Sequence, residues 1–185
     1  MARARIATIL MVGIVAVTAD GLAKEKLNAE RDLIVFVGKR LSVTPQPPEL
    51  GLDLKFEAHY QVLQLVFGQY ERPQITFTVY DHYGSPAFAR YETALMFVSR
   101  HEGKLYHEKY EFIPVYPTAD GRWAGCGDPY RFEPPVHRGE LKPAPIKFAN
   151  IVKHEKTGKR CTHGNYVEEL FLVKKNGVLK ARRWF

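Results

Sequence analysis

The sequence predicts a mainly β protein, a small antiparallel barrel or sandwich with an extra hairpin at its C-terminus. Three observations lead to this expectation. Short segments of continuous or alternating apolar residues recur along the 185-residue chain. Glycine, proline and Asx-Gly pairs separate them, as turns between antiparallel strands require. Past the N-terminal segment, no long stretch repeats apolar residues at the period of an amphipathic helix, apart from a turn or two over 24–30.

The N-terminus has the pattern of a secretory signal peptide. Two arginines precede an apolar run over 6–19, and small residues follow at the spacing of a cleavage site. We expect a signal peptide over 1–19, or 1–23, and a single β-rich domain over 24–185. The alternative is an uncleaved membrane anchor. The run is shorter than the roughly 20 apolar residues of a spanning helix, so we expect no transmembrane segment in the mature chain.

Three strands are expected first, over 32–43, 56–68 and 74–84. The first begins as a continuous apolar run and then alternates, and Gly38 predicts a β-bulge within it. We expect one face of that strand to carry Leu33, Val35, Val37, Leu41 and Val43. The inward residues of the other two are expected to be Phe56, Ala58, Tyr60, Val62 and Val66, and then Ile75, Phe77 and Val79.

Residues 94–112 predict a hairpin that follows a short helix or loop. With Gly103 and Lys104 as a two-residue loop, Phe97 pairs with Tyr110 and Leu95 with Phe112 as a buried ladder. The same register puts His101 and His107 on opposite faces, where they cannot share a metal ion.

The neighbouring pair Asp81-His82 resembles an acid–base dyad in composition only. Adjacent side chains of a strand point to opposite faces, so we expect a solvated strand end before the turn at Gly84.

Two Asx-Gly pairs predict later hairpin turns, at Asp120-Gly121 and at Asn176-Gly177. With the second turn, Lys175 faces Val178, and the same register sets Phe171 opposite Arg182 and Glu169 opposite Trp184. The apolar side of the hairpin is expected to pack on the core. Its outward side mixes basic and aromatic groups, which suits an anionic, flat or sugar-like ligand. The alternative is a solvated side whose aromatic residues are covered by a loop or another subunit. The outward residues are Phe171, Lys175, Lys180, Arg182 and Trp184.

Cys126 and Cys161 are the only two cysteines, and they lie 35 residues apart. In an oxidising compartment two thiols usually pair, so we expect a disulfide, which the chain-entropy model values at roughly 4 kcal/mol. The alternatives are a thiol nucleophile, Cys126 with His163 or His137 as its base, and a zinc site built from these four residues. The spacing of the four does not match a usual zinc knuckle.

The order of the first strands is similar to a known family. Phe36-Val37-Gly38-Lys39, Tyr60-Gln61-Val62 and Phe67-Gly68 resemble the opening of netrin-module and tissue metalloproteinase inhibitor domains, over the first third of the mature chain. The resemblance implies an OB-like barrel in an exported protein. Those inhibitors ligate the target's zinc with an N-terminal cysteine, whereas Asp20 or Lys24 would come first here. Inhibition of that kind is therefore not implied.

The charge and the absence of catalytic motifs bear on function. The formal net charge is +7, and removing Arg3 and Arg5 with the signal peptide leaves 25 basic against 20 acidic residues, or +5. That charge permits an anionic ligand without requiring one, and we expect no nucleic acid partner in vivo. No phosphate loop, serine elbow or paired carboxylates occur. The sequence thus predicts a secreted or periplasmic binding protein without cofactor or metal, acting on an exported or envelope partner. The alternative function is a small thiol-dependent enzyme or hydrolase; an envelope assembly subunit is a third option.

Overall fold

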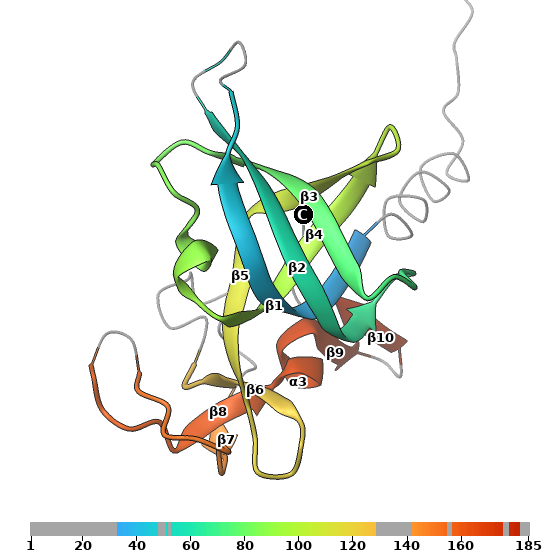
Figure 1. The fold of residues 1–185 in the computed structure, drawn as a ribbon. Helices are drawn as coiled ribbons and strands as arrows, with labels where there is room; N and C mark the ends of the chain where they lie inside the picture. Colours follow the sequence, from blue (N-terminus) through green and yellow to red (C-terminus); the bar gives the residue numbers. More distant parts are fainter. Residues whose placement is uncertain are drawn as a thin grey trace, which may run out of the picture.

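A ring of five strands forms the first part of the structure (Figure 1). The computed structural model describes residues 33–47, 51, 53–128, 142–154, 157–175 and 178–181, with the backbone alone from residue 171 onward. The protein is mainly β, as the sequence predicts. The five strands of the ring are β1 (Leu33–Pro45), β2 (Leu54–Phe67), β3 (Gln74–Asp81), β4 (Thr93–His101) and β5 (Lys104–Pro117).

The strand order makes the ring an OB-like barrel. Hydrogen-bonded neighbours follow the order β3-β2-β1-β4-β5, and β5 then returns to β3 through a parallel pairing of Thr78 with Tyr106. The other barrel pairings are antiparallel. A short 3-10 helix, η1 (Ala87–Arg90), connects β3 to β4 and buries Phe88. A five-stranded, partly open barrel of this kind is the OB-fold architecture.

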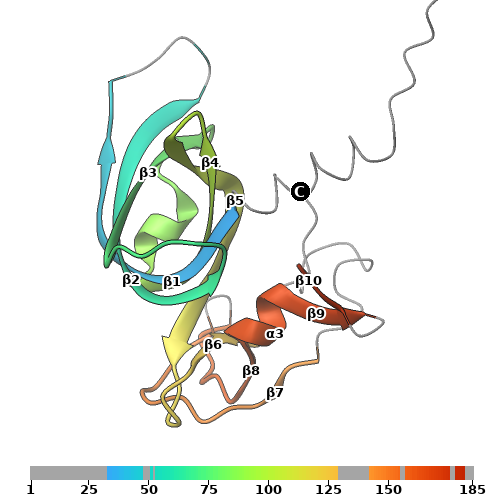
Figure 2. The ribbon, with the colours of Figure 1, turned by 90° about the vertical axis from the view of Figure 1, so that its right-hand side faces the viewer.

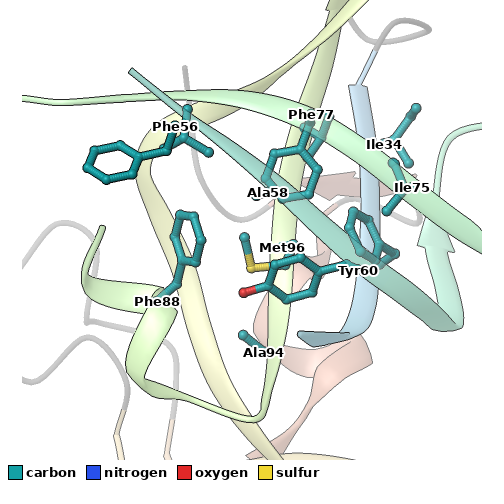
Figure 3. Close-up of a cluster of buried hydrophobic side chains, with 12 residues drawn as sticks. Ile34, Phe56, Ala58, Tyr60, Ile75, Phe77, Phe88, Ala94 and Met96 are labelled. Carbon is teal, nitrogen blue, oxygen red and sulfur yellow. The ribbon is translucent and has the colours of Figure 1, made fainter. Parts of the chain in front are cut away.

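The barrel interior is filled by aromatic and aliphatic side chains (Figure 3). Tyr60 lies at its centre, with its ring centroid 5.6 Å from that of Phe77 and 6.1 Å from that of Phe88. The inward faces expected for β2 and β3 are confirmed at their central residues, which are buried in the interior, with Val62 packed against them. Val66 was expected on the same face but packs against a second cluster, so that part of the expectation is wrong. The interior cluster comprises Ile34, Phe36, Phe56, Ala58, Tyr60, Ile75, Phe77, Val79, Phe88, Ala94, Met96 and Val98.

A second cluster lies outside the barrel wall, because β1 is buried on both faces over 33–38. This explains the continuous apolar run of its sequence. The covering elements belong to a C-terminal extension, which lies below the barrel in Figure 2. Beyond the barrel, β5 pairs with β6 (Trp123–Cys126), β6 with β8 (His163–Tyr166), and β8 with the two-residue β7 (Ala144–Pro145).

A short helix completes the extension. In α3 (Val167–Phe171), Val167 and Leu170 are buried in one cluster with Leu33, Val35 and Val37 of β1. The first strand of the C-terminal hairpin was expected to include residues 169–171, and that expectation is wrong. Apolar residues three apart, 167 and 170, meet one surface from a helix, which alternation cannot achieve.

The expected single face of β1 is also wrong. Leu33, Val35 and Val37 do belong to one cluster, but Val43 packs against the barrel interior and Leu41 is 42% exposed. Register shifts occur beside Gly38 and again between Arg40 and Ser42. Each added residue reverses the side on which the following residues lie. At Gly38 the extra residue is Leu63 of β2, and β1 pairs with β4 without interruption over 33–39, so the bulge predicted within β1 at Gly38 is not present. The extra residue of β1 itself is Leu41, between Arg40 and Ser42, and this bulge is where the face changes.

The β4–β5 hairpin differs from the expected register. His101 pairs with Lys104, so the two-residue loop is Glu102-Gly103. Both loop residues have positive φ, 49° and 77°, as a type I′ turn requires, and glycine occupies the second position. Past a bulge, Met96 pairs with Phe112, so the expected pairs Phe97–Tyr110 and Leu95–Phe112 are not formed.

The two later turns differ in outcome. Asp120-Gly121 lies within a five-residue turn rather than a two-residue loop, because Pro117 pairs with Trp123. The buried Thr118 closes that turn by donating its hydroxyl to Arg122 O. At the C-terminus, β9 (Leu172–Lys175) pairs with β10 (Val178–Ala181), in the expected register that sets residue 175 opposite 178. The turn residues 176 and 177 lie outside the described chain.

Candidate functional site: a tyrosine cluster on the barrel surface

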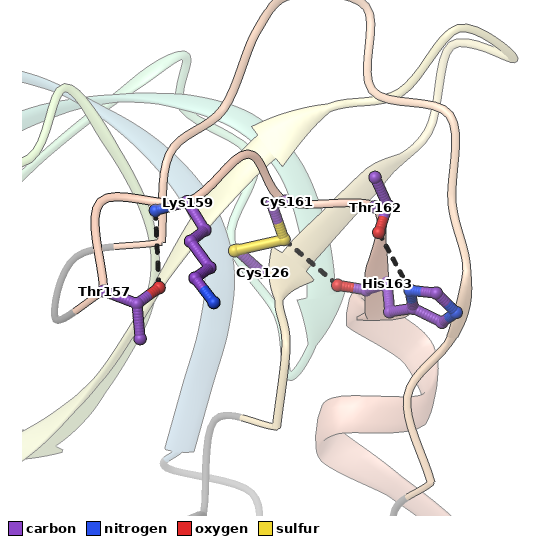
Figure 4. The surroundings of a disulfide bond; sticks show 6 residues. All are labelled: Cys126, Thr157, Lys159, Cys161, Thr162 and His163. Atoms are coloured by element: carbon purple, nitrogen blue, oxygen red, sulfur yellow. Dashed lines mark hydrogen bonds between the residues drawn. A yellow bond between two sulfur atoms is a disulfide. The ribbon is translucent and has the colours of Figure 1, made fainter.

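The two cysteines form the expected disulfide (Figure 4). Cys126 ends β6 and Cys161 precedes β8, with 5.9 Å between their Cα atoms. The bond ties the antiparallel pair β6–β8 together at its end. His163, the base of the thiol alternative, has its Nδ1 3.0 Å from Thr162 Oγ1. With both sulfurs bonded, neither the nucleophile alternative nor the zinc alternative has its thiolate, and His137 lies outside the described residues.

The ligand-binding residues predicted at the C-terminus are only partly covered. Phe171 is the last residue of α3 rather than a strand residue, so it is not placed opposite residue 182 as expected. Lys175 and Lys180 belong to β9 and β10, in the backbone register that the prediction requires. Arg182 and Trp184 lie outside the described residues. The hairpin site stays a prediction.

A different group of side chains is brought together at the end of the barrel where β3 ends. We call it the tyrosine cluster, and its five members form a closed circuit of contacts. Tyr83 and Tyr110 have ring centroids 6.0 Å apart, and the Lys109 ammonium lies 5.5 Å from the Tyr110 centroid. Lys109 Nζ donates to Asp53 Oδ2 at 2.6 Å, His82 Nδ1 lies 3.4 Å from Asp53 Oδ1, and the His82 and Tyr83 rings meet edge to face at 5.4 Å.

Three segments far apart in the sequence supply the cluster. Asp53 immediately precedes β2, His82 and Tyr83 follow β3, and Lys109 and Tyr110 belong to β5. The two tyrosines are well exposed, at 85% for Tyr83 and 48% for Tyr110. Large apolar rings are seldom exposed side by side without a function, since contiguous exposed apolar surface marks interaction sites.

The backbone at Tyr110 is strained. Its φ is +67°, in the left-handed region that costs a residue with a Cβ about 1–2 kcal/mol. Tyr110 lies in a large bulge of β5. His107 pairs with Val98 and Phe112 pairs with Met96, so four residues of β5 lie opposite a single residue of β4. Strained non-glycine residues occur preferentially at ligand and active sites, where the rest of the structure holds them in place.

His107 anchors the bulge from inside. Its Nε2 donates to Glu111 O at 3.0 Å, which closes the loop of extra residues. The imidazole packs against the rings of Phe88 and Phe77 at centroid distances of 4.7 and 6.1 Å. Burial lowers the pKa of His107 to about 3, so the ring is neutral and its single N–H serves this bond. The inner side of the bulge is thus held by the core, and its outer side presents Lys109 and Tyr110.

The charges of the cluster are paired with one another. The hydrogen bond from Lys109 lowers the pKa of the Asp53 carboxyl, and the same bond raises the pKa of the Lys109 ammonium. Both groups therefore stay charged across the physiological range. Because they neutralise each other, the cluster presents hydrogen-bonding groups and aromatic rings without a strong net charge.

Sequence reasoning missed this cluster because it depends on the bulge. Asp81 and His82 indeed do not form a dyad, since His82 lies against Asp53. Asp81 is not solvated as expected but 7% exposed, and its Oδ1 accepts from Tyr83 N at 2.8 Å. This Asx turn fixes the backbone of Tyr83. The run Asp81-His82-Tyr83-Gly84 is the available signal in the sequence, and by itself it indicates no more than a strand end.

Comparisons with known proteins add no relative. No family model, no curated protein and no solved structure matches this chain. In the described part of the chain, no three His, Cys, Asp or Glu residues lie together as a metal site needs. No helix of the described residues has the length and apolar character to cross a membrane.

Proposed function

We propose that the protein is an exported, non-enzymatic binding protein that takes its ligand on the outer surface of the barrel. The observation that carries this proposal is the tyrosine cluster, where a strained backbone presents two exposed rings beside a paired carboxylate and ammonium. The barrel interior is packed with side chains, so the surface is where a ligand has access. The disulfide supports export, since such bonds persist in oxidising compartments.

The rival function needs a reduced Cys126. A thiol-dependent enzyme would use that thiolate with His163 or His137 as base, whereas the bond to Cys161 ties up the sulfur. The two proposals make different predictions for a thiol titration of the purified protein, unfolded in denaturant without reductant. The binding protein carries no reactive thiol; a labelled Cys126 would favour the enzyme.

The C-terminal hairpin is a second candidate surface, for an anionic ligand. The backbone register of β9 and β10 supports the arrangement on which Lys175 and Lys180 were grouped. Arg182, the third basic residue of the prediction, lies outside the described residues. We expect the mature protein to be retained on heparin–agarose, and the double variant Lys180→Glu, Arg182→Glu to elute early with an unchanged circular dichroism spectrum. Retention that persists in this variant would remove the hairpin as the site.

The binding function itself is tested with a panel of immobilised ligands. Oxidised mature protein is passed over heparin–agarose, cellulose, chitin and cross-linked amylose, together with a heat-denatured control. We expect specific retention on at least one matrix, abolished by soluble competitor. A protein that none of the four matrices retains would contradict the proposal.

A further inference from the structure

The tyrosine cluster has the chemistry of a sugar-binding surface. We infer that it binds a neutral glycan, with Tyr83 and Tyr110 stacking on the C–H faces of pyranose rings and Asp53 accepting hydrogen bonds from their hydroxyls. This inference rests on the proposed binding function and names the class of ligand and the residues that hold it.

The rings provide the apolar part of the contact. Tyr83 and Tyr110 are neighbours at 6.0 Å with an angle of 38° between their planes. Two tilted, exposed phenol rings form a shallow angled platform rather than a slot. The faces of aromatic rings carry negative potential and attract the slightly positive C–H groups of a sugar face. Because these contacts need no deep cleft, they suit one segment of a long chain lying on the surface.

The polar groups provide the directional part. A carboxylate offers about four lone-pair sites, so Asp53 can accept from sugar hydroxyls while it also accepts from Lys109. The Lys109 ammonium has three donors, and one of them is used on Asp53. Beside the platform, His82 adds a ring nitrogen 3.4 Å from Asp53. Donors and acceptors placed next to stacking rings match a sugar, which has hydroxyls at its rim and C–H groups on its faces.

The pairing of charges argues for a neutral ligand. Polyanions and single-stranded nucleic acids are held by several cationic side chains whose counterions they release. Here the one ammonium of the cluster lies 2.6 Å from a carboxylate that also faces His82. That carboxylate would repel a phosphate or sulfate. A neutral glycan meets no such repulsion.

The bulge explains how the platform stays in place. His107 holds the inner side of the bulge in the core through Glu111 O, and the Asx turn of Asp81 fixes Tyr83. Both rings are thus positioned before a ligand arrives, which lowers the entropy lost on binding. The positive φ of Tyr110 is the conformational cost of this placement.

The test uses nuclear magnetic resonance titrations of the oxidised mature protein with four soluble probes: cellohexaose, chitohexaose, heparin hexasaccharide and an oligothymidylate. We expect at least one neutral hexasaccharide to shift the amide signals of residues 82–84 and 108–111. Its dissociation constant should change by less than twofold between 50 and 500 mM salt, because no ion release is involved.

Two variants test the site, and a third serves as the control. Tyr110→Gly removes the ring and relieves the positive φ, so we expect a higher melting temperature together with at least tenfold weaker binding. Such a result cannot come from unfolding. Tyr83→Ala should weaken binding to a similar extent. The matched control is Tyr70→Ala, which removes a tyrosine outside the cluster and should leave the affinity unchanged.

The possible outcomes separate this inference from the proposal on which it rests. Retention on heparin–agarose in the panel, together with no binding of either neutral hexasaccharide, would overturn the inference and leave the binding function standing. Preferential binding of the oligothymidylate or of the heparin probe at the cluster would do the same. Neutral-glycan binding that survives both Tyr110→Gly and Tyr83→Ala would place the glycan elsewhere and refute the site.

Discussion

His107 makes the stability of the barrel depend on pH in a calculable direction. Burial between Phe77 and Phe88 lowers its pKa from the ordinary 6.5 to about 3. Below pH 6.5 the His107 ring takes up a proton in the unfolded chain but stays neutral in the folded protein. The free energy of unfolding therefore decreases as the pH falls. The loss approaches about 1.4 kcal/mol per pH unit, or about 3 kcal/mol by pH 4.5, and it ends near pH 3.

The assay is urea denaturation at pH values between 4 and 8, on the wild type and on His107→Gln. Glutamine can still donate to Glu111 O but does not titrate, so we expect this variant to be less stable at pH 7 and to show a flatter pH profile. The difference between the two profiles cancels the other titrating groups. His101→Gln, at the exposed hairpin end, is the matched control and should keep the wild-type slope. Parallel profiles for the wild type and His107→Gln would refute the reasoning.

Three further predictions concern stability. Cys126→Ser, Cys161→Ser and the double variant should each lose about 4 kcal/mol, and reductant should lower the melting temperature of the wild type alone; equal melting with and without reductant would contradict this. The Tyr60 hydroxyl is buried without a hydrogen-bond partner among the described residues, so Tyr60→Phe should stabilise by about 1 kcal/mol in denaturant titrations, and a clear loss would indicate a bound water. A Cβ on Gly164 would overlap Gly125 O across the β6–β8 pair, so Gly164→Ala should cost about 2 kcal/mol or more, and a melting temperature like that of the wild type would show that the backbone yields.

Local patterns predicted those elements whose signals are local. The alternation of Phe56, Ala58 and Tyr60 determined the inward side of β2, and two cysteines in one chain determined the disulfide. The bulge of β5 could not be predicted in this way, because it is stabilised by His107 packing against Phe88, a contact made through the fold. The pattern of β1 was ambiguous for a related reason.

A strand buried on both faces shows no alternation from which a face can be read. In β1, Ile34 belongs to the cluster inside the barrel while Val35 belongs to the outer cluster, so apolar residues occupy both sides. The candidate site could not be predicted from the sequence, because Asp53, Tyr83 and Tyr110 come together only when the five strands form the barrel. The sequence does contain a local signal for the Asx turn of Asp81, which fixes the backbone of Tyr83.

The seam of the ring has a consequence for local opening. β1 pairs with β2 over 35–45 and with β4 over 33–39, whereas among the described residues a single ladder pair, Thr78 and Tyr106, joins β3 to β5 along what we call the seam. The amide protons of residues 35–39, which are paired on both sides, should therefore exchange with solvent only through global unfolding. Those along the seam should exchange through smaller separations of β3 and β5. Tyr83 and Tyr110 lie on opposite sides of that seam. A ligand that spans both rings would act as a clasp, and it would slow exchange there before any other strand responded.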